Sequence, residues 1–346
     1  MTEKWAHYAT PNPEFQAALE AASFLNAPVP SVPGESEIIT RQRLANQVHR
    51  SQVEAAGPPV GLTVEDRKIP VTTPPGEVEI RVYTPQSPHS DNSSEVFPLY
   101  INFHGGGYCL GSLDTDALKC RKISSTHRLV VIDINYRHAP QFPWPTAPND
   151  SYDATKWIVA NASNLRVDLT KGFIVGGASA GGNLASLITQ RARNDPDLRG
   201  KITGQALQVP NTLLHDVKYG ESIKGQLLSR EQCKNDFLIN EKVLQLLFDA
   251  YKPPSNTNNE ASPLLADSLN GLPPALIQIA GADPLRDEGL LYEQGLRESG
   301  IATKLEVYPG VHHAFAVFFP NISQTKKWET DLNEGLRWLL SLSNPN

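Results

Sequence analysis

The segment Gly177-Ala178-Ser179-Ala180-Gly181-Gly182 lies between an apolar stretch, residues 173–175, and a stretch that favours a helix from Asn183 onward. A serine on a sharp strand-to-helix turn is held in strained backbone, so the residues two before and two after it must be small. Glycine occupies both positions here. The turn exposes the hydroxyl and directs the helix N-terminus at it, which favours developing negative charge. The segment therefore predicts a nucleophile, Ser179, rather than an incidental serine.

The same glycines loosely match a dinucleotide-binding fingerprint, read as Gly176-x-Ala178-x-x-Gly181. Ala178 stands where that fingerprint needs glycine, so the backbone could not approach a pyrophosphate closely. The segment also lies deep in the chain rather than after a first strand. Because no Gly-Lys-Ser/Thr follows, a Walker loop is excluded as well. We therefore do not expect nucleotide binding.

Apolar and helix-favouring stretches alternate on both sides of this segment. Residues 129–134 are almost continuously apolar, as expected of a central strand covered on both faces. Residues 62–70 and 78–83 alternate apolar and polar around a predicted hairpin turn at Pro74-Pro75-Gly76. Strands alternating with helices imply an α/β fold with a mostly parallel sheet and helices on both faces. Further strands are predicted at 97–103, 173–175, 275–280 and 304–307, and helices at 150–160, 184–193 and 328–340.

Two regions fall outside this alternation. Residues 1–58 look helical, with Asn12 as a capping residue ahead of Pro13 at the first helical position. Residues 210–270 are polar and also helical in pattern. We expect these two regions to form a helical cap over a catalytic core made of residues 59–209 and 271–346.

The composition excludes several classes of partner. A chain of 346 residues with 40% hydrophobic residues suits one compact α/β domain with an appended lid. A net charge of -6, without a long basic run, argues against nucleic acid or an anionic membrane surface as a partner. Neither a secretory signal nor an apolar stretch long enough for stable membrane insertion is visible. The three cysteines suggest neither a disulfide framework nor a zinc site, so we expect a cytoplasmic protein.

A glycine run, His104-Gly105-Gly106-Gly107-Tyr108, directly follows the apolar stretch 99–103. An acyl-transfer enzyme must stabilise a tetrahedral oxyanion, and backbone N–H groups do this best where no side chain blocks their approach. A glycine run at the carboxyl end of a strand supplies such groups. A merely flexible loop, in contrast, seldom begins with histidine after an apolar strand. The segment therefore predicts an oxyanion-binding loop.

An acid follows a later strand. Asp283 comes soon after the apolar stretch 275–280, where its side chain can point into the active face. The competing interpretation is a plain helix cap ahead of Pro284, which would open the next helix. Asp287 is a rival acid, but one helical turn further on it is expected to face solvent or to make a structural contact.

Two adjacent histidines, His312 and His313, follow the last predicted strand. The chain order serine, acid, histidine is the order found in α/β hydrolases. In that arrangement the histidine takes the serine proton and returns it to the leaving alcohol, while the acid orients the imidazole. Chemistry alone does not decide which of the two histidines acts.

Together these motifs resemble the hormone-sensitive-lipase-like branch of the α/β hydrolases, which includes microbial carboxylesterases, arylacetamide deacetylases and plant carboxylesterases. The resemblance runs from about residue 82 to the C-terminus, and it includes Asn135-Tyr136-Arg137-His138-Ala139-Pro140 and Ser262-Pro263-Leu264. In this family the histidine lies five residues after the tyrosine of a Y-x-G-x-x-H-x-F pattern, here Tyr308. The resemblance therefore implies a catalytic triad of Ser179, Asp283 and His313.

The resemblance also implies an oxyanion hole formed by the N–H groups of Gly105, Gly106 and Ala180, with His104 in a structural role. Three departures from the family pattern leave every catalytic group in place. They are Ala178 where many members carry Asp or Thr, Ala314 for the usual Gly, and Gln141 where Glu is frequent. The resemblance fades in residues 1–58 and 210–260, which would shape the substrate pockets.

These features predict a serine carboxylic-ester hydrolase that acts through an acyl-enzyme on small to medium apolar esters. No metal or organic cofactor is expected, and the partner would be a small-molecule ester. A pathway-specific lactonase, deacetylase or acyltransferase is the alternative among enzymes. A non-catalytic small-molecule receptor is the alternative of another class, but the plant gibberellin receptors that resemble this family lack the triad histidine, and His313 is present here. Monomer and homodimer are both compatible with the sequence.

Overall fold

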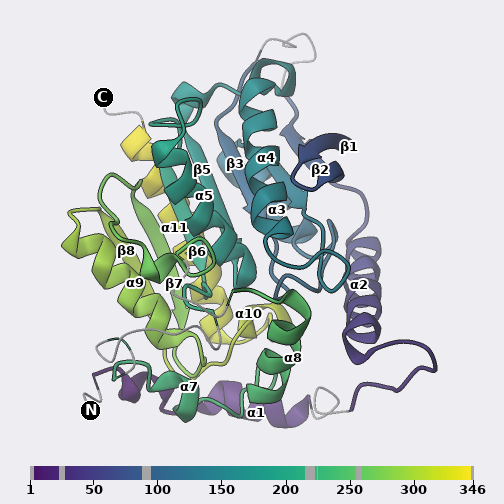
Figure 1. Ribbon diagram of the computed structural model, residues 1–346, viewed down its shortest axis with the longest axis vertical. Helices are drawn as coiled ribbons and strands as arrows, with labels where there is room; N and C mark the ends of the chain where they lie inside the picture. Colours follow the sequence, from purple (N-terminus) through teal and green to yellow (C-terminus); the bar gives the residue numbers. More distant parts are fainter. Residues whose placement is uncertain are drawn as a thin grey trace.

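An eight-stranded sheet forms the centre of the computed structural model, which describes residues 4–22, 28–87, 95–214, 223, 225–254 and 259–343 (Figure 1). The strand order is β1-β2-β4-β3-β5-β6-β7-β8. The β1–β2 and β2–β4 pairs are antiparallel and all the others are parallel, which confirms the predicted mostly parallel sheet. The strands are β1 (Leu62–Thr72), β2 (Pro75–Pro85), β3 (Leu99–Phe103), β4 (Val130–Asn135), β5 (Phe173–Ala178), β6 (Gly204–Gln208), β7 (Ala275–Ala280) and β8 (Thr303–Tyr308).

Helices cover both faces of the sheet, as predicted. One face packs against α4 (Thr146–Ala160), α5 (Ala180–Asn194) and α9 (Arg286–Glu298). The other face packs against α3 (Ala117–His127) and α11 (Ser323–Ser343), so α5 and α11 lie on opposite sides of the sheet (Figure 1). Because strand side chains alternate between faces, each central strand contributes to both apolar layers.

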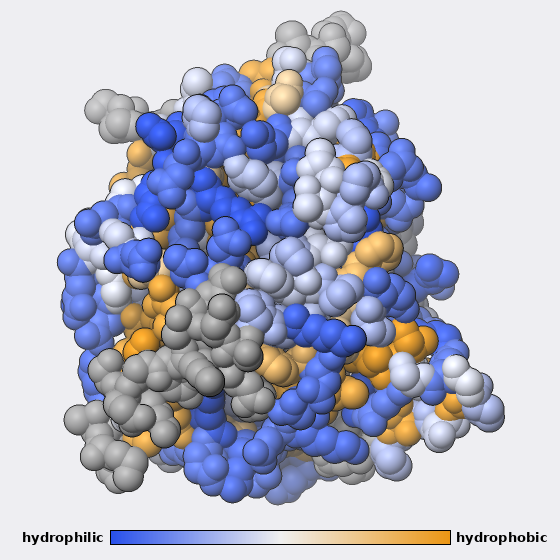
Figure 2. Space-filling model, viewed as in Figure 1, coloured by the Kyte–Doolittle hydropathy of each residue, from blue (hydrophilic) through white to orange (hydrophobic). Residues whose placement is uncertain are grey.

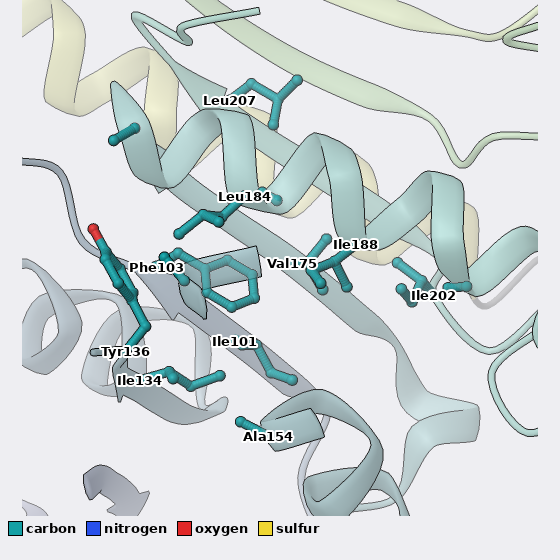
Figure 3. Close-up of a cluster of buried hydrophobic side chains, with 14 of the residues drawn as sticks. Ile101, Phe103, Ile134, Tyr136, Ala154, Val175, Leu184, Ile188, Ile202 and Leu207 are labelled. Atoms are coloured by element: carbon teal, nitrogen blue, oxygen red, sulfur yellow. The ribbon is translucent and has the colours of Figure 1, made fainter. Parts of the chain in front are cut away.

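A tightly packed apolar layer lies between the sheet and α5, the helix that follows the predicted nucleophile. Leu184 and Ile188, one helical turn apart on α5, point toward the sheet, where Phe103 and Val175 lie (Figure 3). All four side chains are fully buried. Each contributes roughly 1.5–3 kcal/mol through removal of its apolar surface from water. The start of α5 is therefore anchored on a rigid support.

Several helices gather beyond the carboxyl ends of the parallel strands, at the lower end of Figure 1. They are α1 (Pro13–Ala21), α7 (Ser229–Gln232), α8 (Glu241–Tyr251) and α10 (Phe315–Phe318), and α2 (Glu37–Ala56) contacts α8 from the side. The Asn12 side chain accepts a hydrogen bond from the N–H of Phe15 (3.0 Å), so the predicted cap of α1 is confirmed. Parts of the two predicted cap regions (1–3, 23–27, 215–222, 224 and 255–258) lie outside the described residues. Short 3-10 helices complete the fold at Ala6–Ala9, Ala162–Leu165, Leu169–Lys171 and Pro263–Leu265.

Three local features differ from the sequence predictions. β6 escapes prediction because it is short and carries buried glutamines, so it lacks an apolar run. α5 begins at Ala180, directly after the serine, and not at Asn183. The helix after Pro284 begins two residues later than predicted, at Arg286. Before this helix begins, the carboxylate of Asp283 accepts a hydrogen bond from the N–H of Leu285 (2.8 Å) and closes a turn.

Within the described residues, no helix is long and apolar enough to cross a membrane. The same residues contain no group of three or more His, Cys, Asp or Glu side chains placed to hold a metal ion. Cys109, Cys120 and Cys233 are buried and unpaired.

Candidate active site

Ser179 lies on the strained turn that its surroundings predict. Its φ of 56° and ψ of -118° fall where non-glycine residues seldom occur. Its N–H donates to the carbonyl of Gln208 (2.9 Å), and its own carbonyl accepts from the N–H groups of Asn183 (3.1 Å) and Asn211 (3.2 Å). Hydrogen bonds from three directions therefore hold the unfavourable backbone in place.

The glycines of this turn are required by the close approach of β3. A Cβ added to Gly181 would meet the carbonyl oxygen of Phe103 and would lie 2.7 Å from its carbonyl carbon. A Cβ on Gly177 would meet the same oxygen and would lie 2.5 Å from the backbone of Gly181. Any side chain here would push β3 and α5 apart, so the sequence pattern reflects packing as well as exposure of the serine.

Asp283 and His313 meet at the carboxyl ends of β7 and β8. The Nδ1 of His313 lies 2.7 Å from the Oδ2 of Asp283, and both side chains are buried. The other carboxylate oxygen of Asp283 accepts the N–H of Leu285, so this one residue is both the turn cap and the partner of a histidine. Ser179 and His313 line the same cavity. The structure thus places Asp283 and His313 in contact, and it places Ser179 on the same cavity as His313.

The surroundings of His313 stabilise its protonated form more than water does. Burial opposes the imidazolium, but the adjacent Asp283 carboxylate, its hydrogen bond and the more distant Asp236 outweigh this effect and raise the pKa of His313. A histidine that becomes charged readily can accept a proton from a serine hydroxyl.

His312 points elsewhere. Its ring packs against Phe15 of α1 (5.0 Å between centroids) and stacks with Phe237 (5.9 Å, 22° between planes). Asp283 bonds to His313 and not to its neighbour, so the geometry separates two histidines that the chemistry of the sequence leaves equivalent.

The glycine run curves beside Ser179. Gly106 has a φ of +118°, and a Cβ there would meet the carbonyl oxygen of Leu110. Among the described residues, no hydrogen bond uses the N–H groups of Gly105, Gly106 or Ala180. They remain available to a ligand oxygen, and the N–H of Ala180 belongs to the first residue of α5.

His104, at the start of this loop, supports it through buried contacts. It is fully buried, stacks on Tyr136 (4.5 Å, 17°), and its Nδ1 lies 2.8 Å from the carbonyl oxygen of Gly105. Tyr136 donates to the carbonyl of His104 (2.8 Å). Burial lowers the pKa of His104, so its ring is neutral at ordinary pH. These contacts are those of a structural residue.

A cavity of about 310 Å³ opens over Ser179 and His313. The side chains of α8 form much of its apolar wall, through Val243, Leu244, Leu247 and Phe248, and Ala45 of α2 also lines it. Hydrophobic residues also reach the surface between α2 and α8, on the lower right of Figure 2. The cavity is thus an apolar chamber beside the predicted nucleophile.

One side of the cavity is polar, a feature that no sequence motif indicates. Lys119 of α3 donates to Asp116 (2.8 Å) and lies 3.4 Å from the side-chain oxygen of Gln208, and all three residues line the cavity. Asp116 also accepts from Asn102 (3.0 Å). The attraction of Asp116 outweighs burial and raises the pKa of Lys119, which keeps the ammonium charged.

The rival acid Asp287 does not face solvent. It is buried on α9, pairs with Arg286 (2.7 Å) and accepts from the N–H of Ser229 (2.7 Å). The prediction of a structural contact is therefore correct, and the alternative of solvent exposure is wrong, because α7 covers this turn of α9.

Two further observations concern residues next to the site. Ala314, where the resembled family carries glycine, has a φ of 55°, a left-handed conformation that alanine adopts at a cost of roughly 1–2 kcal/mol. Asp236, which no sequence pattern distinguishes within its polar segment, accepts a hydrogen bond from the N–H of His313 (2.9 Å).

Comparison with known proteins agrees with this geometry. Residues 100–317 match the family model described as the alpha/beta hydrolase fold. The chain is 34% identical over 283 residues to an AB hydrolase superfamily protein of Schizosaccharomyces pombe, covering 82% of this chain and 81% of that protein. It is 36% identical over 283 residues to the carboxylic ester hydrolase LipN of Mycobacterium tuberculosis, covering 80% and 71%. The solved structure of vibralactone cyclase superposes with a TM-score of 0.87 at 32% identity, covering 98% of this chain and 97% of that one.

Proposed function

Because the chain belongs to the alpha/beta hydrolase family, within its carboxylesterase branch, and is a serine hydrolase of carboxylic esters, we propose that Ser179, His313 and Asp283 carry out its reaction. The observation that carries this assignment is the 2.7 Å contact between His313 and Asp283 beside the cavity that Ser179 lines. A buried histidine held by a buried carboxylate, on the same cavity as a half-buried serine, is the arrangement that activates a serine.

The first half of the reaction acylates the serine. The Oγ of Ser179 attacks the ester carbonyl carbon while the Nε2 of His313 takes the hydroxyl proton. Asp283 holds Nδ1–H of the imidazole and stabilises the imidazolium that forms. The tetrahedral intermediate then collapses, His313 gives its proton to the leaving alkoxide, and an alcohol departs.

The second half hydrolyses the acyl-enzyme. A water molecule gives its proton to His313 and attacks the acyl carbon, after which Ser179 leaves with the returned proton and a carboxylic acid is released. In both halves the negative charge develops on the former carbonyl oxygen. The unbonded N–H groups of Gly105, Gly106 and Ala180 would receive it, and removal of one such donor typically lowers kcat by about 10²–10³-fold.

The chamber supports small to medium apolar esters as substrates. Its volume, about 310 Å³, is at the lower end of ligand-binding cavities, and α8 lines it with aliphatic and aromatic side chains. We propose that residues 1–58 and 210–270 form the cap that encloses it, since α2 and α8 both contribute to its wall. The composition and the three buried thiols support a cytoplasmic setting.

Hydrolysis of p-nitrophenyl acetate and butyrate tests the proposal. We expect the wild type to release p-nitrophenol and to react with an organophosphate, and Ser179→Ala to lose both properties while keeping its melting temperature. A wild-type protein that neither turns over these esters nor is labelled would contradict the assignment.

A second candidate function is lactone chemistry. The likeness to vibralactone cyclase over nearly the whole chain favours it. The same acyl-enzyme would form a lactone if a hydroxyl of the acyl group, rather than water, attacked it, and the reverse path would open one. Incubation with a panel of simple lactones and hydroxy esters, analysed for ring opening and ring closure, distinguishes this function from plain ester hydrolysis.

A further inference from the structure

We propose that Asp236, in the segment between α7 and α8, is a positioning residue that holds His313 for catalysis and ties it to two residues of the cavity wall. The inference rests on the proposed function, because it takes His313 as the general base. Asp236 lies outside the sheet and its flanking helices, in the loop between α7 and α8.

The contacts of Asp236 join two loops that are far apart in the chain. Its Oδ2 accepts from the N–H of His313 (2.9 Å), 77 residues away. Its Oδ1 accepts from the N–H groups of Leu238 (2.7 Å) and Ile239 (2.9 Å), and both of these residues line the cavity. One carboxylate therefore fixes two cavity-lining residues and the backbone of the predicted base together.

A buried carboxylate is unfavourable unless such contacts compensate it. Asp236 is 2% exposed, and an ionised acid without partners would be strongly destabilised there. Its three backbone partners are all donors, which suits an ionised acid, since a carboxylate only accepts hydrogen bonds. A neutral apolar side chain could fill the space but could not hold the N–H of His313.

The loop that carries His313 is also held from other sides. The N–H of Gly310 donates to the carbonyl of Tyr8 (2.8 Å), next to the packing of His312 between Phe15 and Phe237. The N-terminal arm and the segment around Asp236 thus meet on one catalytic loop. Among these contacts, that of Asp236 reaches His313 itself and brings a charge.

The negative charge of Asp236 acts on the pKa of His313, and a residue that only packed against the loop would not have this effect. The titratable and charged groups around His313 are Arg230, Cys233 and Asp236 from the segment containing α7, Asp283 after β7, Arg286, Asp287 and Glu288 of α9, and His312. Arg286 pairs with Asp287, and Arg230 pairs with Glu288. Asp236 lies 3.7 Å from the Nδ1 of His312 and adds a negative charge near His313 beyond that of Asp283. Burial lowers the pKa of His313, and the carboxylates of Asp283, Asp236 and Glu288 raise it, so loss of the Asp236 charge lowers it.

The test compares the pH dependence of kcat/KM for wild type and Asp236→Asn with p-nitrophenyl butyrate. A general base must be neutral, so kcat/KM falls as the pH drops below the pKa of His313. We expect the acidic limb of Asp236→Asn to move toward lower pH by roughly one unit, as for loss of a nearby opposite charge. We also expect kcat to fall roughly tenfold, because an amide N–H₂ would face the N–H of His313 or of Leu238.

Asn240→Ala is the matched control. Asn240 caps α8 by accepting from the N–H of Val243 (3.2 Å), so its loss loosens the same segment without touching His313. We expect a lower melting temperature with an unmoved acidic limb. An Asp236→Asn enzyme with the wild-type limb, or an Asn240→Ala enzyme that reproduces the shift, would overturn the inference. If Asp236→Asn does not fold, Asp236→Glu replaces it: retention of the charge should keep the limb in place while kcat falls, and a moved limb would count against the inference.

The two proposals fail in different ways. A wild-type protein without ester turnover contradicts the proposed function, whereas an active wild type with an unmoved Asp236→Asn limb contradicts only the role of Asp236. Without turnover, the imidazole pKa is read from histidine NMR titrations of both proteins, with the His313 signal identified by its loss in His313→Gln. An equal pKa in the two proteins would then overturn the inference.

Discussion

Replacement of Gly106 by alanine should inactivate the enzyme while leaving most of its stability. The φ of +118° at this position lies outside the left-handed helical region, where a non-glycine residue is strained at a cost of order 1–3 kcal/mol. In addition, the new Cβ would meet the carbonyl oxygen of Leu110 and would lie 2.7 Å from its carbonyl carbon. The loop therefore cannot keep its path.

The size of the displacement follows from these contacts. Carbon atoms in van der Waals contact lie roughly 3.5–4.0 Å apart, so the backbone at Gly106 must move by about 1 Å. Such a shift removes the N–H of Gly106 from the developing oxyanion. Loss of one such donor lowers kcat by about 10²–10³-fold, or roughly 3–4 kcal/mol of transition-state stabilisation. We expect KM to change much less, because the donor acts mainly on charge that develops in the transition state.

Gly300→Ala is the matched control for backbone strain. Gly300 has a φ of +75° at the exposed end of α9, with nothing within 4 Å of an added Cβ. Both variants should lose stability in urea unfolding, but only Gly106→Ala should lose kcat with p-nitrophenyl butyrate. A folded Gly106→Ala enzyme with kcat within about threefold of wild type would refute the oxyanion role of this loop.

Two further predictions concern the loop at the ends of β7 and β8. His313→Ala should lower kcat by at least about 10³-fold, whereas His312→Ala should mainly lower the melting temperature; the opposite pattern of rates would mean that the other histidine is the base. Deletion of residues 1–30 removes the fully buried Phe15 and the contact of Tyr8 with Gly310, so it should lower stability by roughly 3–5 kcal/mol and alter acyl-chain preference. Unchanged kinetics and an unchanged melting curve in that deletion would argue against a cap that includes the N-terminal arm.

Local patterns explain why much of the fold could be predicted. The apolar stretches at β3, β4, β5 and β7 indicate strands that are buried on both faces of a sheet. Each stretch can be recognised from a few consecutive residues. β6 could not be predicted in this way, because its glutamines are buried by neighbouring strands and not by any apolarity of its own. The start of α9 differs from the prediction for a related reason, because Asp283 contacts His313 and closes a turn before the helix begins.

Three features could be recognised without the structure: the strand-to-helix turn at Ser179, the glycine run of the candidate oxyanion hole, and the order of serine, acid and histidine. Each depends on neighbours in the chain, where steric limits on the backbone leave few alternatives. The choice of His313 over His312 followed from the family pattern and not from local chemistry, and the structure adds the contact of Asp283 with His313. The three-dimensional arrangement was needed to place a charged lysine at one side of an apolar cavity and to show that Asp236 holds the catalytic loop. These features depend on distances and burial between segments far apart in the chain, and no local pattern of residues encodes them.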